Sequence, residues 1–552
     1  MLVFVSPGRD GAGTARAVNT ATSETIADHK PIDLGSWMAS FEECEHPRWV
    51  LPAVDELYPN LLARGIRLDR CHDLTLSEGL LLAHEGRHGT HRNPAAAWAR
   101  LHGRPEPEDK PPPARDTQPT LFELDERFHP IDQLIEVYDD QQRRIAANAH
   151  PDRLRLLTAS ESAGALAAAE MSAHGLPWSE QVHLELLESM LGPRTAPGVR
   201  PAKLAELAER IVAAFGGRSL NPDSPPSVVK AFAREGIDIP STRAWVLKEI
   251  DHPAVEPLLE YKELARMWTA HGWSWLESWV RDGRFRPEYV VGGVVSGRWA
   301  TRGGAALQLP KALRTAVRAL PGWSLVVADA AQLEPRVLAA LSDDRKLAEF
   351  ASDVDLYAGL AADSFEGDRD KAKIAMLSAM YGGTSGGAGP LLAVLRKRFP
   401  QAVGHVEQAA QAGEQGRMVR SRLGRTSPFP SERWSALMER TEGTEEEMRK
   451  SRQAARDWGR FTRNFVVQAS AADWALVLLV VLRRRLAALD PKAEIVFYQH
   501  DEFMVHCPAE TAGLVTEQLL ASGEEASRLL FGDTPVRFPL QIATVNSYAD
   551  AK

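Results

Sequence analysis

Carboxylates that follow apolar stretches are the residues of this chain best suited to do chemistry. Asp501 and Glu502 stand between two runs of β-branched and aromatic residues, 495–498 and 503–505, which predict two strands that meet at this point. Two adjacent carboxylates repel each other unless a cation lies beside them. Taken alone, the stretch favours a solvated polar turn. A metal-binding turn becomes the better interpretation once a second carboxylate site is found.

A second carboxylate lies upstream, in the stretch SLVVADAAQLEPRVLAAL (324–341). Residues 325–328 predict a buried strand that ends at Asp329, and 334–341 predict the helix that follows. An Asp at the carboxyl end of a buried strand is a recurrent position for a ligand or a metal. Helix capping is the alternative, but Asp329 stands five residues before Glu334, which is far for a cap.

A cationic helix is predicted between the two carboxylate sites. The stretch RDKAKIAMLSAMYGG (369–383) has a helical pattern and a glycine stop. Arg369, Lys373, Leu377 and Tyr381 recur every four residues and therefore share one face. A solvated basic face would explain the two cations but leaves Tyr381 without a reason. A nucleoside triphosphate would use all four, with cations on its phosphates and apolar surface under its sugar and base.

A third polar face lies within 456–486, which predicts a long helix or a helix pair. Arg460, Asn464 and Gln468 recur every four residues there. Amide side chains on one face suit base edges or sugars. A polar seam between two helices is the alternative.

Together these residues supply the parts of two-metal phosphoryl transfer. Hard Mg²⁺ ions prefer carboxylate oxygens, and two ions can clamp the attacking and leaving oxygens of an in-line displacement. Cationic side chains such as Arg369 and Lys373 stabilise the charge on a triphosphate and on the leaving pyrophosphate.

Length and composition indicate the number of subdomains and the class of protein. At 552 residues the chain is too long for one core, so several subdomains are expected. The net charge of -9 argues against a generally basic protein that coats nucleic acid, but not against a local basic groove. Three cysteines are too few for a disulfide framework or a zinc cluster. Neither a signal peptide nor a membrane span is visible, so a cytoplasmic protein is expected.

The remaining segments predict the elements that must position the sites. Residues 1–83 resemble a small α/β unit, with strands at 1–5 and 48–52 and helices at 57–63 and 74–82. Residues 85–120 are rich in Pro, Arg, His and charge, which predicts a linker or a mobile loop. The remaining predicted elements are helices at 131–147, 154–173, 178–191, 201–214 and 255–280, an irregular glycine-rich stretch at 290–310, a solvated run at Arg483–Arg485 and a closing strand at 536–543.

Three motifs in the same order identify a resemblance to family A DNA polymerases, the bacterial DNA polymerase I group. The resemblance runs from about Leu154 to the C-terminus. The family motif D-Y-S-Q-I-E-x-R is similar to the stretch from Asp329 through Gln332 and Glu334 to Arg336. The motif R-x3-K-x3-(F/Y)-x3-Y-G is similar to the helix face described above, followed by Gly382, and H-D-E matches His500, Asp501 and Glu502. Weaker matches are SGRW around Arg298, LQLP around Gln308, and the R-x3-N-x3-Q face at 460–468.

The resemblance implies an α+β and α/β multidomain fold, in which a right-hand polymerase follows a small α/β exonuclease-like domain. The implied domains are 1–150 and 151–552, with a thumb at 177–285, a palm at 290–345 and 465–552, and fingers at 346–460. The implied activity is DNA-directed DNA polymerase, a nucleotidyltransferase that adds deoxynucleotides to a primer 3′ end, in DNA repair or gap filling. The implied cofactors are two Mg²⁺ ions, with Mn²⁺ as an alternative. The implied partners are primer–template DNA and dNTPs, with no membrane and a monomeric protein.

The resemblance also implies a role for each site residue. Asp329, Asp501 and the carbonyl of Ala330 would hold the metals, and Lys373 and Glu502 would join the two aspartates in catalysis. The residues implied to bind the dNTP are Arg369, Lys373, Leu377, Tyr381, Gln332, Glu334 and His500, with Glu334 blocking a ribose 2′-hydroxyl. The residues implied to bind DNA are Arg298, Gln308, Arg336, Arg460, Asn464 and Gln468.

Two departures from the family motifs affect the nucleotide pocket. Ala330 and Ala331 replace Tyr-Ser, which removes a phenol that supports Glu334 in the family. Leu377 stands where the family has Phe or Tyr beside the sugar. These changes predict a less rigid pocket with altered sugar discrimination.

The N-terminal unit resembles a 3′–5′ exonuclease domain without its full set of carboxylates. Asp73 stands at the second acidic position, and residues 137–140 (VYDD) are loosely similar to the third. The first motif, D-x-E on an early strand, has no counterpart in 1–50, and a two-metal nuclease site cannot form without it. The prediction is a degenerate, structural domain and a polymerase that lacks proofreading. The alternatives are a polymerase with an active exonuclease and a non-catalytic DNA-binding protein; a single-subunit RNA polymerase is disfavoured by Glu334.

Overall fold

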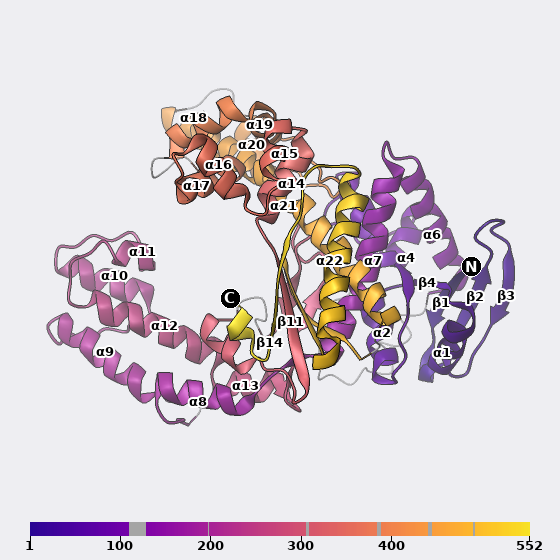
Figure 1. Ribbon diagram of the computed structural model, residues 1–552, viewed down its shortest axis with the longest axis horizontal. Helices are drawn as coiled ribbons and strands as arrows, with labels where there is room; N and C mark the ends of the chain where they lie inside the picture. Colours follow the sequence, from indigo (N-terminus) through magenta and orange to yellow (C-terminus); the bar gives the residue numbers. More distant parts are fainter. Residues whose placement is uncertain are drawn as a thin grey trace. The chain divides into compact units, whose positions relative to one another are not determined.

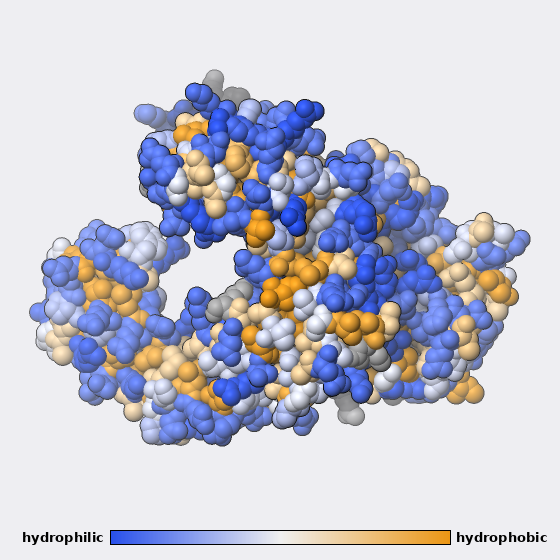
Figure 2. Space-filling view, viewed as in Figure 1, coloured by the Kyte–Doolittle hydropathy of each residue, from blue (hydrophilic) through white to orange (hydrophobic). Residues whose placement is uncertain are grey.

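The structure is a computed structural model that describes residues 1–109, 129–196, 198–304, 309–383, 388–439, 444–489 and 492–551. The chain forms two compact units, each built from separate segments of sequence (Figure 1). Unit 1 comprises Met1–Ala173, Tyr289–Ala300 and Val326–Ala543. Unit 2 comprises His174–Glu288, Thr301–Leu325 and Thr544–Lys552. In Figure 2, hydrophilic side chains cover most of the visible surface of both units.

The N-terminal part of unit 1 is a five-stranded sheet covered by helices, which confirms the predicted α/β unit. The strands are β1 (Leu2–Pro7), β2 (Gly13–Val18), β3 (Thr25–His29), β4 (Arg48–Leu51) and β5 (Arg70–Asp73), in the order β3-β2-β1-β4-β5. The helices are α1 (Leu34–Glu45), α2 (Val54–Ala63), α3 (Leu74–His84), α4 (Pro94–Leu101) and α6 (Ile131–Ala146). Alternate residues of β1 enter different core clusters, Val3 and Val5 one and Leu2 and Phe4 the other. The sheet is thus covered on both faces, which explains why β1 is apolar throughout.

Helix α4 lies inside the segment that was predicted to be a linker, so that prediction is wrong for residues 94–101. Asn93 caps the helix by accepting a hydrogen bond from the Ala96 backbone N–H (2.8 Å), and Pro94 occupies its first turn. Arg100 then fixes the helix through the buried carboxylate of Glu78 (2.9 Å). Residues 110–120 of the predicted linker lie outside the described part of the chain.

A four-stranded sheet lies in the middle of unit 1 and carries both predicted carboxylate sites. Its strands are β11 (Trp323–Ala330), β12 (Glu494–Gln499), β13 (Glu502–Pro508) and β14 (Leu540–Val545), in the order β12-β13-β11-β14. The strands predicted at 325–328, 495–498 and 503–505 are confirmed, and the closing strand runs from Leu540 rather than from residue 536. Strands β9 (Glu288–Val290) and β10 (Ala300–Arg302) form a two-stranded pair, with β9 at the start of the glycine-rich stretch and β10 within it.

Helix α21 (Glu445–Leu489) is a single helix of 45 residues. Of the two alternatives predicted for this segment, the long helix is confirmed and the helix pair is wrong. Its most apolar 18-residue window has a mean hydropathy of 2.1, enough by length and composition alone to cross a membrane. In the structure, 89% of that window is buried inside the protein. It packs against α19 (Pro400–Glu414) and α22 (Ala512–Phe531), so its apolar surface belongs to a core.

One arginine of α21 corrects a second prediction. Arg483 belongs to a run that was predicted to be solvated, but its side chain is only 3% exposed. It donates hydrogen bonds to both carboxylate oxygens of Glu170 (2.9 and 2.6 Å) and to the carbonyl oxygens of Leu68 and Asp69. Because neighbouring helical residues point about 100° apart, Arg483 can face inward while Arg484 remains exposed.

Unit 1 also contains a group of helices that lie between β11 and α21 in the chain (Figure 1). These are α14 (Leu333–Ser342), α15 (Arg345–Phe350), α16 (Leu356–Ser364), α17 (Arg369–Tyr381), α18 (Ala388–Arg398), α19 and α20 (Glu432–Met438). Helix α17 confirms the predicted cationic helix. Asp368 caps its start, and Gly382 ends it with φ of 71°, a left-handed conformation that glycine adopts without strain.

Unit 2 is mostly helical. Its helices are α8 (Glu180–Leu191), α9 (Ala202–Ala214), α10 (Pro225–Arg234), α11 (Ala244–Leu247), α12 (Val255–His271) and α13 (Trp273–Trp279), and its short strands are β6 (Leu176–Pro177), β7 (Val280–Arg281) and β8 (Arg284–Phe285). The single helix predicted over 255–280 is wrong, because Gly272 separates α12 from α13. A Cβ at Gly272 would lie 2.3 Å from the Trp268 carbonyl oxygen, so only glycine fits this break.

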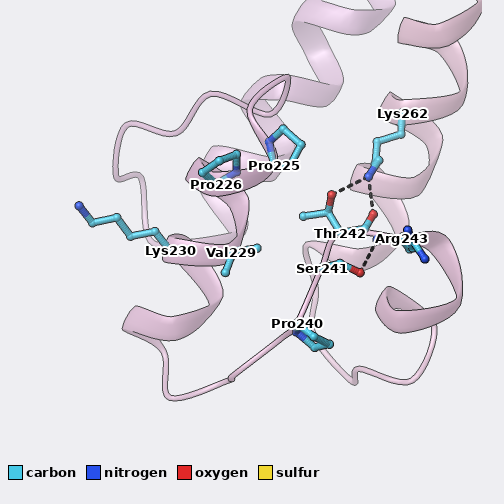
Figure 3. Close-up of a pocket in the computed structure, with 9 residues that line it drawn as sticks. All are labelled: Pro225, Pro226, Val229, Lys230, Pro240, Ser241, Thr242, Arg243 and Lys262. Carbon is cyan, nitrogen blue, oxygen red and sulfur yellow. Dashed lines mark hydrogen bonds between the residues drawn. The ribbon is translucent and has the colours of Figure 1, made fainter. Parts of the chain in front are cut away.

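An open groove of about 500 Å³ lies on unit 2 among α10, α11 and α12 (Figure 3). Three prolines and Val229 line it, and Lys262 is held at its edge by the Thr242 hydroxyl (2.8 Å). None of the predicted site residues lines this groove. The predicted carboxylates lie instead at the strand ends of unit 1.

Candidate active site

The two predicted metal-binding aspartates lie on neighbouring strand ends of the central sheet. The backbone N–H of Ala330, the last residue of β11, donates a hydrogen bond to the carbonyl oxygen of Asp501 (2.9 Å). Asp501 lies in the turn that connects β12 to β13, and both aspartate side chains are partly exposed. Strands paired in this way lie about 5 Å apart, so the two carboxylates share one edge of the sheet.

The turn around Asp501 is conformationally unusual. His500 has φ of 59°, a left-handed conformation that is costly for a residue with a side chain. Its Nδ1 is buried without a hydrogen-bond partner among the residues that the structure describes, and burial lowers the pKa of the imidazole. Glu502 begins β13 and is only 5% exposed, opposite Gln499 on β12. The acidic pair of the sequence is thus split, with Asp501 partly exposed and Glu502 buried.

The turn that follows Asp329 is strained and firmly held. Gln332, at the start of α14, has φ of 55°. Its amide nitrogen donates to Asp355 (2.7 Å), and its amide oxygen accepts from the Leu356 backbone N–H (2.9 Å). Both ends of the Gln332 side chain are therefore engaged within the protein, so a side-chain contact with a nucleotide would require these bonds to exchange.

The donor set at the strand ends fits a divalent cation as an open site. Asp329 and Asp501 offer carboxylate oxygens, and Ala330 offers a backbone carbonyl, which are the hard ligands that Mg²⁺ prefers. Within the described ranges, no group of three or more His, Cys, Asp and Glu side chains could enclose a metal ion. An ion held by two carboxylates would therefore complete its shell with water and substrate oxygens, as Mg²⁺ commonly does.

Glu334, the predicted sugar-excluding residue, is held by two side chains. The Tyr381 hydroxyl donates a hydrogen bond to one carboxylate oxygen, and Arg298 Nη2 donates to the other (2.6 Å). Burial and the neighbouring carboxylate raise the pKa of the Tyr381 phenol, so it stays a proton donor. Glu334 thus has two partners in spite of Ala330, and the less rigid pocket predicted from Ala330 and Ala331 stays a prediction.

The predicted triphosphate face of α17 lies partly in solvent. Arg369 is 48% exposed and pairs through Nε with Asp355 (2.9 Å), a residue that the sequence patterns did not single out. Lys373 is exposed and forms no ion pair with the residues described here, whereas Leu377 is half-buried. Tyr381 is 38% exposed at the end of the helix. Both cations of this face are accessible, and its binding of a triphosphate stays a prediction.

Arg336 was predicted to contact DNA, and the structure contradicts this. Its side chain is 0% exposed. It donates to the Gln332 amide oxygen and to the carbonyl oxygens of Ala331, Ala351, Asp353, Val354 and Arg537. Burial lowers its pKa to about 10, which leaves the group charged at neutral pH. Arg336 therefore ties together the loops behind the site.

The other predicted DNA contacts have different surroundings. Arg460 is exposed, pairs with Asp457, and lies beside Gly382 at the end of α17. Asn464 is half-buried, and its side-chain oxygen has no hydrogen-bond partner within the described chain. Gln468 is also half-buried, and Gln308 lies outside the residues that the structure describes. Arg298 thus contacts Glu334, and Arg460 lies beside the glycine that ends α17.

The acidic residues of the N-terminal sheet are engaged in structural contacts. Asp73 is 2% exposed, and its two oxygens accept from the backbone N–H groups of Val54 and Leu76 (2.7 Å each), so it caps α2 and α3 together. Burial raises its pKa to about 7. Its placement at an exonuclease acidic position therefore does not give a free ligand. Tyr138, by contrast, packs its ring edge-on against Phe4 in the core.

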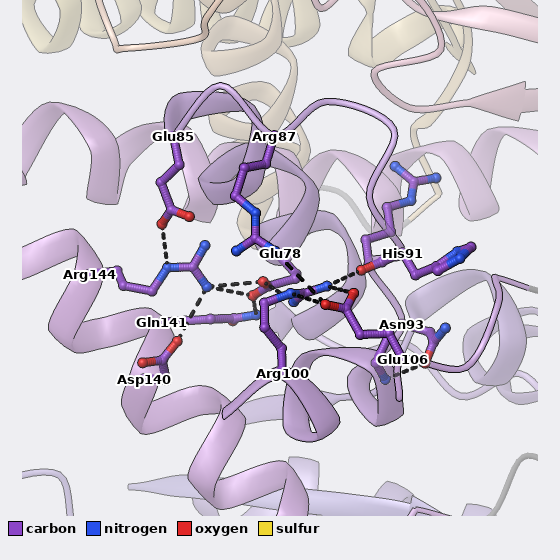
Figure 4. A network of polar contacts seen from close by, with 12 residues as sticks. Glu78, Glu85, Arg87, His91, Asn93, Arg100, Glu106, Asp140, Gln141 and Arg144 are labelled. Atoms are coloured by element: carbon purple, nitrogen blue, oxygen red, sulfur yellow. Dashed lines mark hydrogen bonds and ion pairs between the residues drawn. The ribbon is translucent and has the colours of Figure 1, made fainter. Parts of the chain in front are cut away.

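The carboxylates around Glu78 form ion pairs with arginines (Figure 4). Glu78 is almost fully buried between Arg100 (2.9 Å) and Arg144 (2.9 Å), and Gln141 also donates to it. Asp140, from the predicted third exonuclease motif, accepts from Arg144 (3.3 Å). Arginines thus supply the positive charge beside these two carboxylates.

Sequence comparisons match this chain to a protein family and to individual relatives. The family described as DNA polymerase family A matches residues 200–544. DNA polymerase I of Treponema pallidum is 25% identical over 381 residues, covering 63% of this chain and 36% of the relative. The thermostable DNA polymerase I of Thermus aquaticus is 26% identical over 332 residues, covering 55% and 37% respectively. The chain thus matches little more than a third of the length of these relatives.

A solved structure resembles the chain over its whole length. The POL domain of Pol1 from M. smegmatis, in complex with DNA primer–template and dNTP, matches 100% of this chain and 95% of its own, with a TM-score of 0.73 and 18% sequence identity. This likeness establishes the mixed α/β multidomain fold. The family match extends over most of the chain and includes the strands that carry Asp329 and Asp501. The chain belongs to DNA polymerase family A.

Proposed function

We propose that this protein is a template-directed DNA polymerase that adds deoxynucleotides to a primer 3′ end. The observation that carries the proposal is the hydrogen bond from Ala330 N–H to the Asp501 carbonyl, which brings two aspartates from distant segments to one sheet edge. Two Mg²⁺ ions, or Mn²⁺ in their place, would be held by Asp329, Asp501 and the Ala330 carbonyl. When bound, such ions supply charge stabilisation to an in-line phosphoryl transfer.

The protein's own side chains would bind and orient the substrates. The accessible cations Arg369 and Lys373 would bind the triphosphate, and Lys373 would stabilise the charge on the departing pyrophosphate. Leu377 and Tyr381 would offer apolar surface to the sugar and base. Glu334, fixed from two sides, would occupy the space that a ribose 2′-hydroxyl needs.

The same proposal assigns a thumb to 177–285, fingers to 346–460 and a palm to 290–345 and 465–552. Helices α8 to α13 form one unit, which supports the thumb assignment. The boundary at residue 150 stays a prediction, because residues 1–173 group with unit 1. The M. smegmatis neighbour was solved with primer–template DNA and dNTP, and we infer the same partners here. A role in repair or gap filling rests on the family resemblance alone.

We also propose that the protein lacks proofreading. The support is the double-cap role of Asp73 and the absence of a D-x-E pattern from residues 1–50. A nuclease site of the two-metal kind needs several free carboxylates.

The test is extension of a labelled primer on a DNA template by the purified protein with Mg²⁺. Parallel reactions contain deoxynucleotides, ribonucleotides or no nucleotide. The proposal predicts template-directed extension with deoxynucleotides and little with ribonucleotides. Primer shortening without nucleotides would instead show an active exonuclease. Unchanged primer in every reaction, with the DNA still bound, would show a non-catalytic DNA-binding protein.

A further inference from the structure

A single carboxylate, that of Asp355, connects three elements next to the candidate site. One oxygen accepts from Arg369 Nε on α17 (2.9 Å), and the other accepts from the Gln332 amide nitrogen (2.7 Å). The second oxygen also caps α16 by accepting from the backbone N–H groups of Tyr357 and Ala358 (3.0 and 3.1 Å). A residue that served only as a helix cap would need only the last two contacts.

The way Asp355 holds Arg369 leaves the phosphate-binding part of the guanidinium accessible. The ion pair uses Nε, and neither terminal nitrogen of Arg369 bonds to any residue in the described ranges. The guanidinium carbon also lies 5.5 Å from the ring centroid of Tyr357, which is 6% exposed and therefore fixed. Two terminal nitrogens held in one plane suit bidentate binding of a phosphate.

The other side of Asp355 is fixed to the strand that carries Asp329. Gln332 lies three residues after Asp329, and its amide oxygen accepts from the Leu356 N–H (2.9 Å) and from buried Arg336 (3.1 Å). The contact between Asp355 and Gln332 therefore relates the start of α16 to the end of β11. Asp355 therefore fixes Arg369 relative to β11, the strand that carries the predicted metal ligand Asp329.

We infer that Asp355 is a positioning residue that fixes Arg369 for the triphosphate of the incoming nucleotide. This inference rests on the proposed function. Both partners are substantially exposed, 48% for Arg369 and 38% for Asp355, and exposed ion pairs contribute little to stability. The ion pair itself therefore adds little to stability, and the loss of stability expected for Asp355→Ala, about 1 kcal/mol, comes from its capping of α16.

The test compares single-nucleotide incorporation by the parent protein and Asp355→Ala. The KM for the deoxynucleotide is expected to rise roughly 3- to 10-fold, as for loss of a charge-assisted hydrogen bond, with kcat within about 2-fold. Asp355→Asn keeps an acceptor and should recover part of the affinity. The matched control is Asp363→Ala, because Asp363 lies on the same helix and pairs with a different arginine, Arg398 (2.8 Å).

Combining substitutions separates positioning from a structural role. In an Arg369→Ala background, Asp355→Ala should raise KM no further, whereas in a Lys373→Ala background the two effects should multiply. An equal rise in both backgrounds, or a lower thermal midpoint with unchanged KM, would overturn the inference. If the parent protein extends no primer, the proposed function fails. In that case the inference is tested by the affinity of each protein for dGTP in Mg²⁺. Weaker binding by Asp355→Ala than by the parent protein supports positioning, and equal binding refutes it.

Discussion

The backbone N–H of Ala330 and the carbonyl oxygen of Asp501 are joined by a hydrogen bond of 2.9 Å. This bond lies next to the pairing of β11 with β13, so the register of the sheet places the two aspartates on neighbouring strand ends. A one-residue shift in that pairing would turn one carboxylate to the other face. The site thus depends on the buried residues of both strands.

Glu334→Ala should weaken discrimination against ribonucleotides. The substitution opens space beside the sugar and leaves Arg298 and Tyr381 without their shared partner. We expect the ratio of ribonucleotide to deoxynucleotide incorporation efficiency to rise by about tenfold or more. Competition kinetics with paired nucleotides measure this ratio, and the exposed residue Glu349, changed to Ala, is the control. An unchanged ratio would show that Glu334 does not exclude the 2′-hydroxyl.

Arg483→Leu should strongly destabilise unit 1, whereas Arg484→Leu should not. Removing Arg483 leaves the 9%-exposed carboxylate of Glu170 with only the more exposed Arg67 as a cation, and such losses cost about 3–5 kcal/mol. Arg484 is 61% exposed, and its pair with Glu525 is worth less than about 1 kcal/mol. Urea denaturation followed by circular dichroism compares the two variants. Equal stability of both would contradict the assigned burial.

Acid should destabilise unit 2 through His183. The ring is fully buried, accepts from the Trp178 indole at Nδ1 (3.3 Å) and donates from Nε2 to the His271 carbonyl (2.9 Å). Burial lowers its pKa from 6.5 to about 4. Between these values the unfolded state binds more protons, so the free energy of unfolding falls as pH falls from 6.5 to 4, by at most about 1.4 kcal/mol per pH unit.

The His183→Gln variant should lose part of this pH dependence. Unfolding midpoints measured at several pH values between 7 and 4 give the slope. The exposed His150, changed to Gln, should leave the slope as in the parent protein. A parent slope that His183→Gln does not alter would show that His183 is not the group responsible.

Arg336→Lys and Arg460→Ala should affect different properties. Lysine cannot reproduce the fork of donors that Arg336 directs at five carbonyl oxygens, so we expect a loss of at least about 2 kcal/mol in stability. Arg460 is exposed, and its loss should weaken primer–template binding and reduce the salt dependence of that binding. Fluorescence anisotropy and thermal denaturation of both variants provide the comparison. Weaker DNA binding by folded Arg336→Lys with unchanged stability would restore the original assignment.

Local patterns were sufficient to predict the elements that carry the site. Short β-branched runs predicted β11, β12 and β13, and a four-residue repeat with a glycine stop predicted α17. These signals lie within a few residues of each other along the chain, where propensity and periodicity act. The adjacency of Asp329 and Asp501 was inferred from the chemistry and the family motifs, because no local pattern encodes strand order.

Long-range partners account for the predictions that were wrong. Arg483 is buried against acceptors from segments far away in sequence, and Arg336 is buried against loop carbonyls, mostly of the segment that follows it, whose conformation no local pattern predicts. The contact of α4 with Glu78 spans 22 residues, and a charged, proline-rich composition does not reveal it. Asp355 was missed because an Asp before a helix is typical of a simple cap, and only the structure shows its contact with Arg369.

The most direct test of the central claim is single-nucleotide primer extension by Asp329→Asn and Asp501→Asn. Glu510→Gln, an exposed acid just after β13, is the matched control. The proposal predicts that the control extends the primer at the parent rate. Each aspartate variant should lose about 10³-fold or more in rate while still binding DNA and keeping its thermal midpoint. Extension at the parent rate by either aspartate variant would contradict the claim that this pair of strand ends is the active site.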